Sequence, residues 1–283
     1  MSVIDLVVQA PAIGSAEVSA LATLSGARGI HAIATNGHAA YRLVRVSTRD
    51  GVPEFCAASG IDWAFVPSDL RRDRVALVAM DMDSTLITIE CVDEIADVLG
   101  IRREVAVITT AAMRGEIDFA ESLARRVALL AGLPVSALAR VYDERVELSP
   151  GAEAMLEGFR ATGAKTLLVS GGFTFFTDRL GARLGFDETA ANTLEIAEGR
   201  LTGRLVPPIV DAAAKAARFV AMRERLARSP DAIAVAIGDG ANDLPMLRAA
   251  DVSVAWRAKP RVRAQATAMI DHCGLDAALH LFA

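Results

Sequence analysis

Two aspartates, Asp81 and Asp83, directly follow the apolar segment 75–80 (VALVAM). Two other apolar segments end in the same way: Ser-Gly-Gly at 170–172 follows TLLV, and GDGAND at 238–243 follows AIAVAI. In an open parallel sheet the carboxyl ends of the strands share one edge, and ligands bind there. We therefore expect these three segments to meet at a single polar rim.

The rim would carry a concentrated negative charge. Four carboxylates would converge on it, from Asp81, Asp83, Asp239 and Asp243. At an effective dielectric constant of about 20, each pair of like charges about 4 Å apart costs on the order of 4 kcal/mol. A bound cation must offset this repulsion, and hard oxygen ligands with room for water and phosphate favour Mg²⁺. The sequence therefore predicts Mg²⁺ as the cofactor.

Each of these motifs has a structural alternative when it is taken singly. An aspartate after a strand is often a helix N-cap, and Ser-Gly-Gly is a common turn. The GDGAND segment could begin a dinucleotide-binding loop, but its third glycine is absent and Asp239 would face a pyrophosphate. Lys215, in DAAAKAARFV, would usually be a solvated helix charge. The occurrence of all these motifs at one rim favours a catalytic site over separate structural roles.

The segments that carry the rim predict an α/β fold. Continuous apolar runs separated by helices imply a doubly wound, Rossmann-like parallel sheet covered on both faces. The runs are 74–80, 164–169, 231–237 and 252–255. Between the first two lies a helical stretch, 90–144, which is too long for a simple crossover. We interpret it as a helical cap inserted at about 88–146.

Residues 1–70 follow a different pattern. Their order is strand, helix, strand, strand, helix, strand, which predicts a small ferredoxin-like α+β domain. The segments are 3–8, 15–24, 30–35, 40–46, 51–59 and 63–66. The charged segment 67–74 is interpreted as a linker, so that residues 71–283 form the second domain.

Composition excludes several classes of function. The 283 residues carry a formal charge of −5, without the basic footprint that nucleic-acid binding requires. No uncharged apolar stretch approaches the roughly 18 residues of a membrane span, and the N-terminus lacks a basic signal-peptide region. Three scattered cysteines favour neither a disulfide framework nor a zinc site. We expect a cytoplasmic protein with a small-molecule partner and no membrane partner; the oligomeric state stays open, with a homodimer as one candidate.

The motifs together resemble those of a known family. In order and spacing, DMDSTLITIE, SLARRVALL, VSGGF, Lys215 and GDGANDLPML are similar to the phosphoserine phosphatases of the haloacid dehalogenase superfamily. The resemblance covers about 74–271, and residues 1–70 resemble the ACT-like domains sometimes fused to such enzymes. Met82 stands where the family often has Phe, a departure that changes no catalytic position.

The resemblance implies a role for each rim residue. Asp81 would be the nucleophile that forms an aspartyl-phosphate. Asp83, on the same side of an extended chain, would protonate the leaving oxygen and later accept a proton from water. The metal ligands would be Asp81, the backbone carbonyl of Asp83, and Asp239, with Asp243 steadying the waters of the ion or Lys215. The phosphoryl group would be bound by Ser170, Gly171, Lys215 and Asn242.

Selectivity would come from the cap, because the rim can bind any phosphomonoester. Phosphoserine also carries an ammonium and a carboxylate, for which Glu90 and Arg126 match the family's positions. The apolar stripe of the helix 118–132 places Arg126 roughly 55° from its centre and Arg125 roughly 155° away. Arg126 should therefore flank the buried face while Arg125 points to solvent. The resemblance also allows Met113 and Phe119 as substrate contacts, although their apolar side chains favour the core of the cap.

The predicted function is Mg²⁺-dependent hydrolysis of O-phosphoserine, the last step of serine biosynthesis. The nearest alternative is the same chemistry on another small phosphomonoester, or phosphate transfer to an acceptor alcohol. A signalling receiver is a rival of another class, but receivers generally lack an acid two residues after the nucleophile and a cap of this size. A serine sensor with an inert rim is a third alternative, and the intact set of motifs argues against it.

Overall fold

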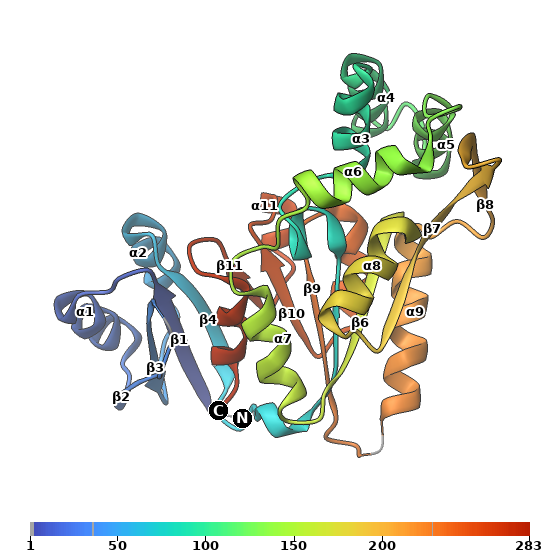
Figure 1. The fold of residues 1–283 in the computed structure, drawn as a ribbon. Helices are drawn as coiled ribbons and strands as arrows, with labels where there is room; N and C mark the ends of the chain where they lie inside the picture. Colours follow the sequence, from blue (N-terminus) through green and yellow to red (C-terminus); the bar gives the residue numbers. More distant parts are fainter. Residues whose placement is uncertain (1–2, 36, 228) are drawn as a thin grey trace.

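The computed structural model describes residues 3–35, 37–227 and 229–283. It contains a large sheet flanked by helices, a group of helices beyond one end of that sheet, and a small N-terminal sheet beside it (Figure 1). No helix in the described ranges is long and apolar enough to cross a membrane.

The large sheet has seven strands in the order β11-β10-β9-β5-β6-β7-β8. Its strands are β5 (Val75–Met80), β6 (Lys165–Phe173), β7 (Glu188–Ala197), β8 (Arg200–Val206), β9 (Ile233–Gly238), β10 (Val252–Trp256) and β11 (Ala268–Ile270). All neighbouring pairs are parallel except β7 and β8. The predicted parallel sheet is confirmed. The β7–β8 hairpin was not predicted, because its strands alternate polar and apolar residues and lack a continuous apolar run.

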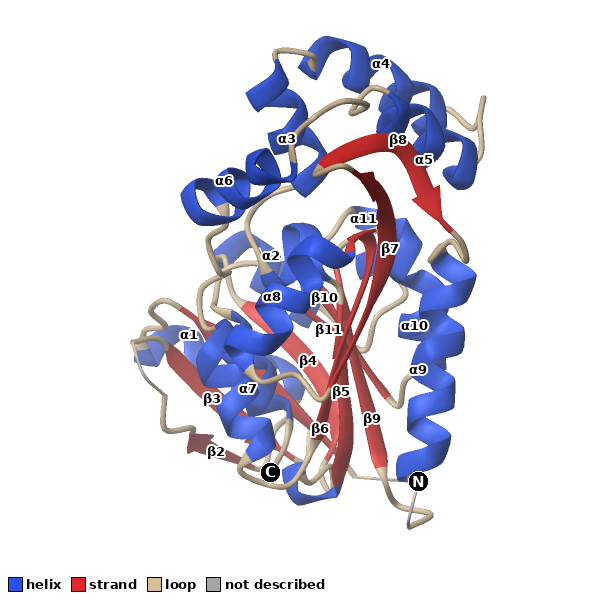
Figure 2. Cartoon of the chain, turned by 45° about the vertical axis from the view of Figure 1, so that its right-hand side comes forward, coloured by secondary structure: helices blue, strands red, loops and turns tan. Residues whose placement is uncertain are grey.

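Helices cover both faces of this sheet (Figure 2). Leu77 and Ala79 of β5 belong to one apolar cluster with residues of α9 (Ala212–Leu226) and α10 (Leu244–Ala249). Val78 and Met80 belong to the opposite cluster, which includes residues of α7 (Ala152–Arg160) and α8 (Thr174–Leu184). Since successive side chains of a strand point to opposite faces, this division confirms the doubly wound arrangement.

Four helices form the insertion between β5 and α7, beyond the carboxyl ends of the strands (Figure 1). They are α3 (Cys91–Leu99), α4 (Arg102–Met113), α5 (Phe119–Ala128) and α6 (Val135–Arg145). The insertion is also tied to the β7–β8 hairpin, because Gly132 donates its N–H to the Leu201 carbonyl and Leu201 donates to that of Leu133, both at 2.8 Å. The cap is thus held to the core sheet at a second place.

The N-terminal sheet has the order β2-β3-β1-β4 and is antiparallel throughout. Its elements are β1 (Ile4–Ala10), α1 (Ser15–Ser25), β2 (Gly29–Ala32), β3 (Ala39–Val44), α2 (Val52–Ser59) and β4 (Asp62–Pro67). This order confirms the predicted ferredoxin-like pattern. One face packs against α1 and α2, whereas Val7, Ala64 and Val66 belong to the main core of the molecule.

Short helical turns complete the chain. They are η1 (Arg72–Arg74), η2 (Met82–Leu86), η3 (Ala241–Asp243), α11 (Pro260–Arg263) and η4 (Leu275–Leu281). Two of them, η2 and η3, directly follow β5 and β9 and carry rim residues.

Candidate active site

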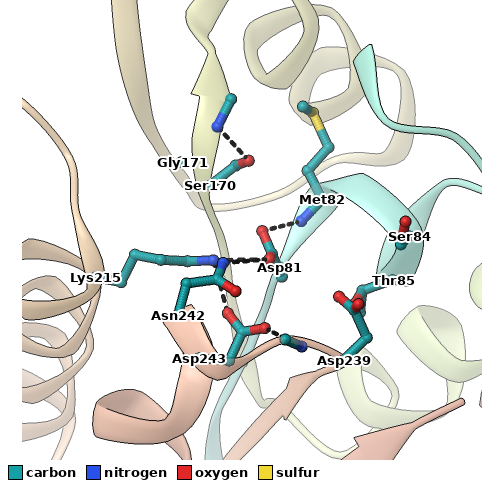
Figure 3. A network of polar contacts seen from close by, with 12 residues as sticks. Asp81, Met82, Ser84, Thr85, Ser170, Gly171, Lys215, Asp239, Asn242 and Asp243 are labelled. Atoms are coloured by element: carbon teal, nitrogen blue, oxygen red, sulfur yellow. Dashed lines mark hydrogen bonds and ion pairs between the residues drawn. The ribbon is translucent and has the colours of Figure 1, made fainter. Parts of the chain in front are cut away.

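Asp81 lies where β5 ends and is only 4% exposed. Its Oδ1 accepts the Met82 N–H at 2.7 Å. Its Oδ2 lies 2.8 Å from Lys215 Nζ and accepts Asn242 Nδ2 at 3.3 Å (Figure 3). The carboxylate is therefore buried, oriented and charge-compensated, as a nucleophile requires.

Asp83 follows Asp81 by two positions, within the η2 turn. Asp81 (φ −71°, ψ 161°) and Asp83 (φ −64°, ψ 134°) both have extended backbone angles and line the same cavity, whereas Ser84 (φ 55°) is left-handed and redirects the chain after them. Asp83 Oδ1 accepts the Cys91 N–H at 3.3 Å, which ties the acid to the start of α3. Burial, and secondly the charge of Glu90, raise the pKa of Asp83 well above its ordinary value. This environment favours a protonated Asp83, which is the form that a general acid needs.

Lys215 is completely buried within α9. Its Nζ lies 2.8 Å from Asp81 Oδ2 and 2.7 Å from Asp243 Oδ1 (Figure 3). Burial alone would lower the pKa of Lys215, but the two aspartates outweigh it and the pKa rises. The predicted alternative of a solvated helix charge is therefore wrong, and a fixed ammonium lies at the nucleophile.

Three carboxylates form a group suited to a metal ion. One oxygen each of Asp81, Asp239 and Asp243 lies within 4.8 Å of the others. Asp243 is already engaged, since it binds Lys215 and accepts the Gly240 N–H at 3.0 Å. Asp239 accepts the Thr85 hydroxyl at 3.1 Å and faces the pocket. Burial and the charge of Asp81 raise the pKa of Asp239. An all-oxygen set of crowded carboxylates fits a hard divalent cation.

The segment 170–172, which we predict to bind phosphate, lies in a bulge of β6. Val169 pairs with Ala190 and Phe173 pairs with Asn192, so β6 advances four positions while β7 advances two. The extra residues carry Ser170 into the rim, where its Oγ accepts the Gly172 N–H at 2.9 Å. Bulges of this kind are frequent beside active sites, where they redirect side chains.

Glu90 and the helix α5 form the cap side of a cavity of about 420 Å³. Glu90 precedes α3, and its Oε1 accepts the Ser84 hydroxyl at 2.7 Å. Arg126 is half-buried and lines the cavity, whereas Arg125 is exposed and pairs with Glu121. The predicted difference between the two arginines is confirmed.

Phe119 covers the phosphate-binding segment from the cap. A methyl group placed on Gly171 would lie 3.1 Å from Phe119 Cζ. Met113, the other predicted cap contact, ends α4, and its side chain lies outside the described residues.

Three further polar residues of the cavity wall, Asp93, Thr109 and Lys259, were not among the predicted site residues. Asp93 follows Glu90 by three positions at the start of α3, a spacing that places two side chains on one helix face. That spacing could have identified it. No sequence pattern marks Thr109 or Lys259.

Comparison with known proteins gives the same assignment. The haloacid dehalogenase-like hydrolase family matches residues 78–248, and a domain of unknown function, DUF4072, matches residues 6–52. A phosphoserine phosphatase of Polaromonas sp. is 52% identical over 218 residues, covering 75% of this chain and 92% of the relative.

Solved structures extend the similarity to the whole chain. A haloacid dehalogenase family hydrolase of Salmonella enterica has a TM-score of 0.88 at 32% identity, covering 99% of this chain and 98% of the other. A phospho-aspartyl intermediate analogue of phosphoserine phosphatase has a TM-score of 0.68 at 32% identity, covering 74% and 99%. The chain therefore belongs to the haloacid dehalogenase-like hydrolases, and within them to the phosphoserine phosphatases.

Proposed function

We propose that the protein hydrolyses O-phosphoserine to serine and phosphate through an aspartyl-phosphate on Asp81, with Mg²⁺ as cofactor. One observation carries this proposal: Asp81, oriented by the Met82 amide and Lys215, and Asp83, whose pKa is raised by burial, line the same cavity. An oriented nucleophile and an acid that retains its proton are what a two-step phosphomonoester hydrolysis needs.

In the first step an oxygen of Asp81 attacks phosphorus, and the bond from phosphorus to the serine oxygen breaks. Asp83 gives its proton to that oxygen, so serine leaves as a neutral alcohol. Lys215 stabilises the charge that develops on the phosphoryl oxygens, together with Ser170, the Gly171 amide and Asn242. In phosphoryl transfer this electrostatic stabilisation matters more than covalent assistance.

In the second step water attacks the same phosphorus atom. Asp83, now a carboxylate, takes a proton from the water, and the bond from phosphorus to Asp81 breaks. Phosphate leaves, and both aspartates return to their starting states. Asp83 therefore serves as the acid of the first half-reaction and as the base of the second.

We assign Asp81, the backbone carbonyl of Asp83, and Asp239 as the residues that would hold Mg²⁺. Asp243 has a different task, because its two oxygens already bind Lys215 and the Gly240 amide. When bound, the ion would neutralise negative charge on the phosphoryl oxygens and on the crowded carboxylates.

The cap residues supply the selectivity. Glu90 would bind the substrate ammonium, and Arg126 its carboxylate, with Phe119 closing the cavity over them. Burial lowers the pKa of Arg126, and the charges of Asp93 and Glu90 oppose that effect. Its Nε donates to the Ser122 carbonyl of its own helix at 3.3 Å. An arginine that lines a cavity in this way is suited to a carboxylate ligand.

We place the reaction in the cytoplasm, where it would complete serine biosynthesis. All three cysteines are free thiols, as is usual in a reducing compartment. A homodimer remains one candidate assembly.

A screen for phosphate release over a panel of small phosphomonoesters tests the proposed function. O-Phosphoserine should give the highest kcat/KM, EDTA should stop turnover, and Mg²⁺ should restore it. Excess Ca²⁺ should inhibit, because its larger and less regular ligand shell spoils in-line geometry. Preference for another phosphomonoester would overturn the substrate assignment, and full activity in EDTA would overturn the metal assignment.

A further inference from the structure

Asn192, on β7, lies outside the residues assigned to catalysis but is bound to the phosphate-binding segment. It is completely buried. Its Nδ2 donates to the carbonyl of Gly171 at 2.9 Å and to that of Val210 at 3.2 Å. Its Oδ1 accepts the Val210 N–H at 2.7 Å. Both ends of the amide are therefore satisfied by backbone groups of two other segments.

The bulge in β6 explains why a side chain is needed at this place. Between the pairs Val169–Ala190 and Phe173–Asn192 the two strands fall out of register. The carbonyl of Gly171 lies within this irregular, partly buried stretch, and a carbonyl shielded from water without a partner is costly. Asn192 Nδ2 provides the partner. The same amide thereby fixes the distance between the bulge and the neighbouring chain.

The second segment leads to the lysine at the nucleophile. Val210 directly precedes Asp211, whose carboxylate accepts the Ala214 N–H and caps α9. Lys215 lies in the first turns of this helix. One side-chain amide thus links two elements that contribute phosphoryl-binding groups, the bulge with Gly171 and the start of α9 with Lys215.

We propose that Asn192 is a positioning residue that sets the separation of these two phosphoryl-binding elements. The inference deepens the proposed function and rests on it for the identity of the bound group. Inorganic phosphate is the smallest ligand that both elements would hold. Loss of the amide should weaken phosphate binding and substrate binding together, because both depend on the spacing of the same groups.

The test compares two variants of Asn192 with a matched control. Asn192→Ala removes all three hydrogen bonds, and Asn192→Asp keeps the side-chain volume but turns an oxygen toward two carbonyls. Asp187→Ala is the control. Its carboxylate also bridges to β6, accepting the Thr166 N–H at 2.9 Å and the Thr166 hydroxyl at 3.0 Å. That bridge lies at the amino end of β6, away from the rim.

Three quantities should be measured for each protein in Mg²⁺: the Kd for inorganic phosphate by calorimetry, KM and kcat for phosphoserine, and Tm. Both Asn192 variants should raise the phosphate Kd and the phosphoserine KM by about tenfold, the change expected when one hydrogen-bonded contact is lost. Asp187→Ala should lower Tm without moving the phosphate Kd by more than about twofold.

Unchanged phosphate affinity in either folded Asn192 variant would overturn the inference. An equal loss of affinity in Asp187→Ala would also overturn it, by showing that affinity follows general stability. If the parent protein binds phosphate but does not hydrolyse phosphoserine, the proposed substrate fails while the calorimetric comparison still decides the role of Asn192.

Discussion

Asp83 is an acid whose surroundings oppose its ionisation. It is enclosed by the cap, Glu90 lies nearby, and a methyl group on Gly172 would come within 2.8 Å of its Oδ2. A folded-state pKa above the unfolded value of about 3.9 means that its favourable contribution to stability is lost as pH rises through the folded pKa. At neutral pH the Asp83 carboxyl therefore lowers the stability of the fold, a cost that is typical of a group retained for catalysis.

Replacing Asp83 by Asn should separate these two effects. We expect Asp83→Asn to abolish turnover, because an amide can neither give nor take the proton. We also expect its Tm in EDTA at pH 7 to rise by about 3 °C, the shift for roughly 1 kcal/mol in a chain of this size. Thermal melts beside the exposed control Asp50→Asn provide the measurement. A lower Tm for Asp83→Asn would show that the carboxyl stabilises the fold.

Because Arg126 and Arg125 carry the same charge on different faces of α5, their variants separate the effect of losing a charge from the effect of its position. If Arg126 binds the substrate carboxylate, Arg126→Ala should cost about 3 kcal/mol of transition-state stabilisation, measured as a fall in kcat/KM for phosphoserine. This is the range for losing one partner of a desolvated charge pair. Arg125→Ala should cost almost nothing, because its partner Glu121 is also exposed. Steady-state kinetics of both variants give the comparison.

Phosphoethanolamine, which lacks the carboxylate, is the control substrate for this pair. On it the Arg126→Ala effect should shrink, since the arginine has no partner to lose. Equal losses at positions 125 and 126, or an undiminished loss on phosphoethanolamine, would defeat the assignment of Arg126 while leaving the phosphatase chemistry intact.

Among the elements, the β6 bulge leaves little space around Gly172. A Cβ at Gly172 would lie 2.8 Å from Asp83 Oδ2, 3.0 Å from Met82 Cε and 3.1 Å from Ser170 Oγ. The first contact is shorter than real Cβ atoms show and the other two are tighter than most, so a side chain at position 172 would force Asp83 or the bulge to shift. The absence of a side chain at Gly172 thereby lets the β6 bulge lie against Asp83.

Gly172→Ala should therefore act on catalysis through geometry. Moving Asp83 or the bulge by about 1 Å should lower kcat about a hundredfold. Gly14→Ala is a suitable control, because φ at Gly14 is −74° and the added methyl group would meet the flexible end of Glu17. Kinetics and melts on both proteins test this expectation, which fails if Gly172→Ala keeps more than a third of the parent kcat.

The sequence predicted the elements that have a clear hydrophobic pattern. It did not predict those features that depend on contacts between distant segments. The strands β5, β6, β9 and β10 were recognisable because they are continuously apolar, and the face of Arg126 followed from helical periodicity. The turn of the chain after Asp83 was not predicted, because Ser84 adopts a left-handed conformation that no local pattern announces. Asn192 was missed for a similar reason: its partners lie 18 and 21 positions away.

At the scale of the whole molecule, the N-terminal sheet is joined closely to the C-terminal segment. The Asp62 carboxylate accepts the N–H groups of Asp271, His272 and Cys273. The Arg42 guanidinium donates to the His280 carbonyl at 3.1 Å. The division at residues 70 and 71 stays a prediction, and a chain that begins near Arg71 would lose these contacts.

His280 makes this junction sensitive to acid. Its Nδ1 lies 2.9 Å from Gln9 Oε1, and burial, with the charges of His38 and Arg72, lowers its pKa to about 4. The unfolded chain binds a proton near pH 6.5 that the folded chain does not, so stability falls as pH decreases between these values. The free energy of unfolding should drop by roughly 3 kcal/mol between pH 7 and pH 4 from this residue alone.

Denaturation curves at a series of pH values check this expectation. His280→Gln should lose most of that pH dependence, whereas the exposed control His31→Gln should keep it. A His280→Gln protein with the parent's acid sensitivity would assign the effect to other groups.

The most direct test of the account is to identify the residue that carries phosphate during turnover. The protein is mixed with O-phosphoserine and Mg²⁺, quenched in acid within one turnover, reduced with borohydride, and digested for peptide mass analysis. Borohydride reduces an aspartyl-phosphate to homoserine, so we predict homoserine at position 81, absent when EDTA is present and absent in Asp81→Asn. Phosphate release from phosphoserine without modification of Asp81, or modification at another residue, would contradict the account.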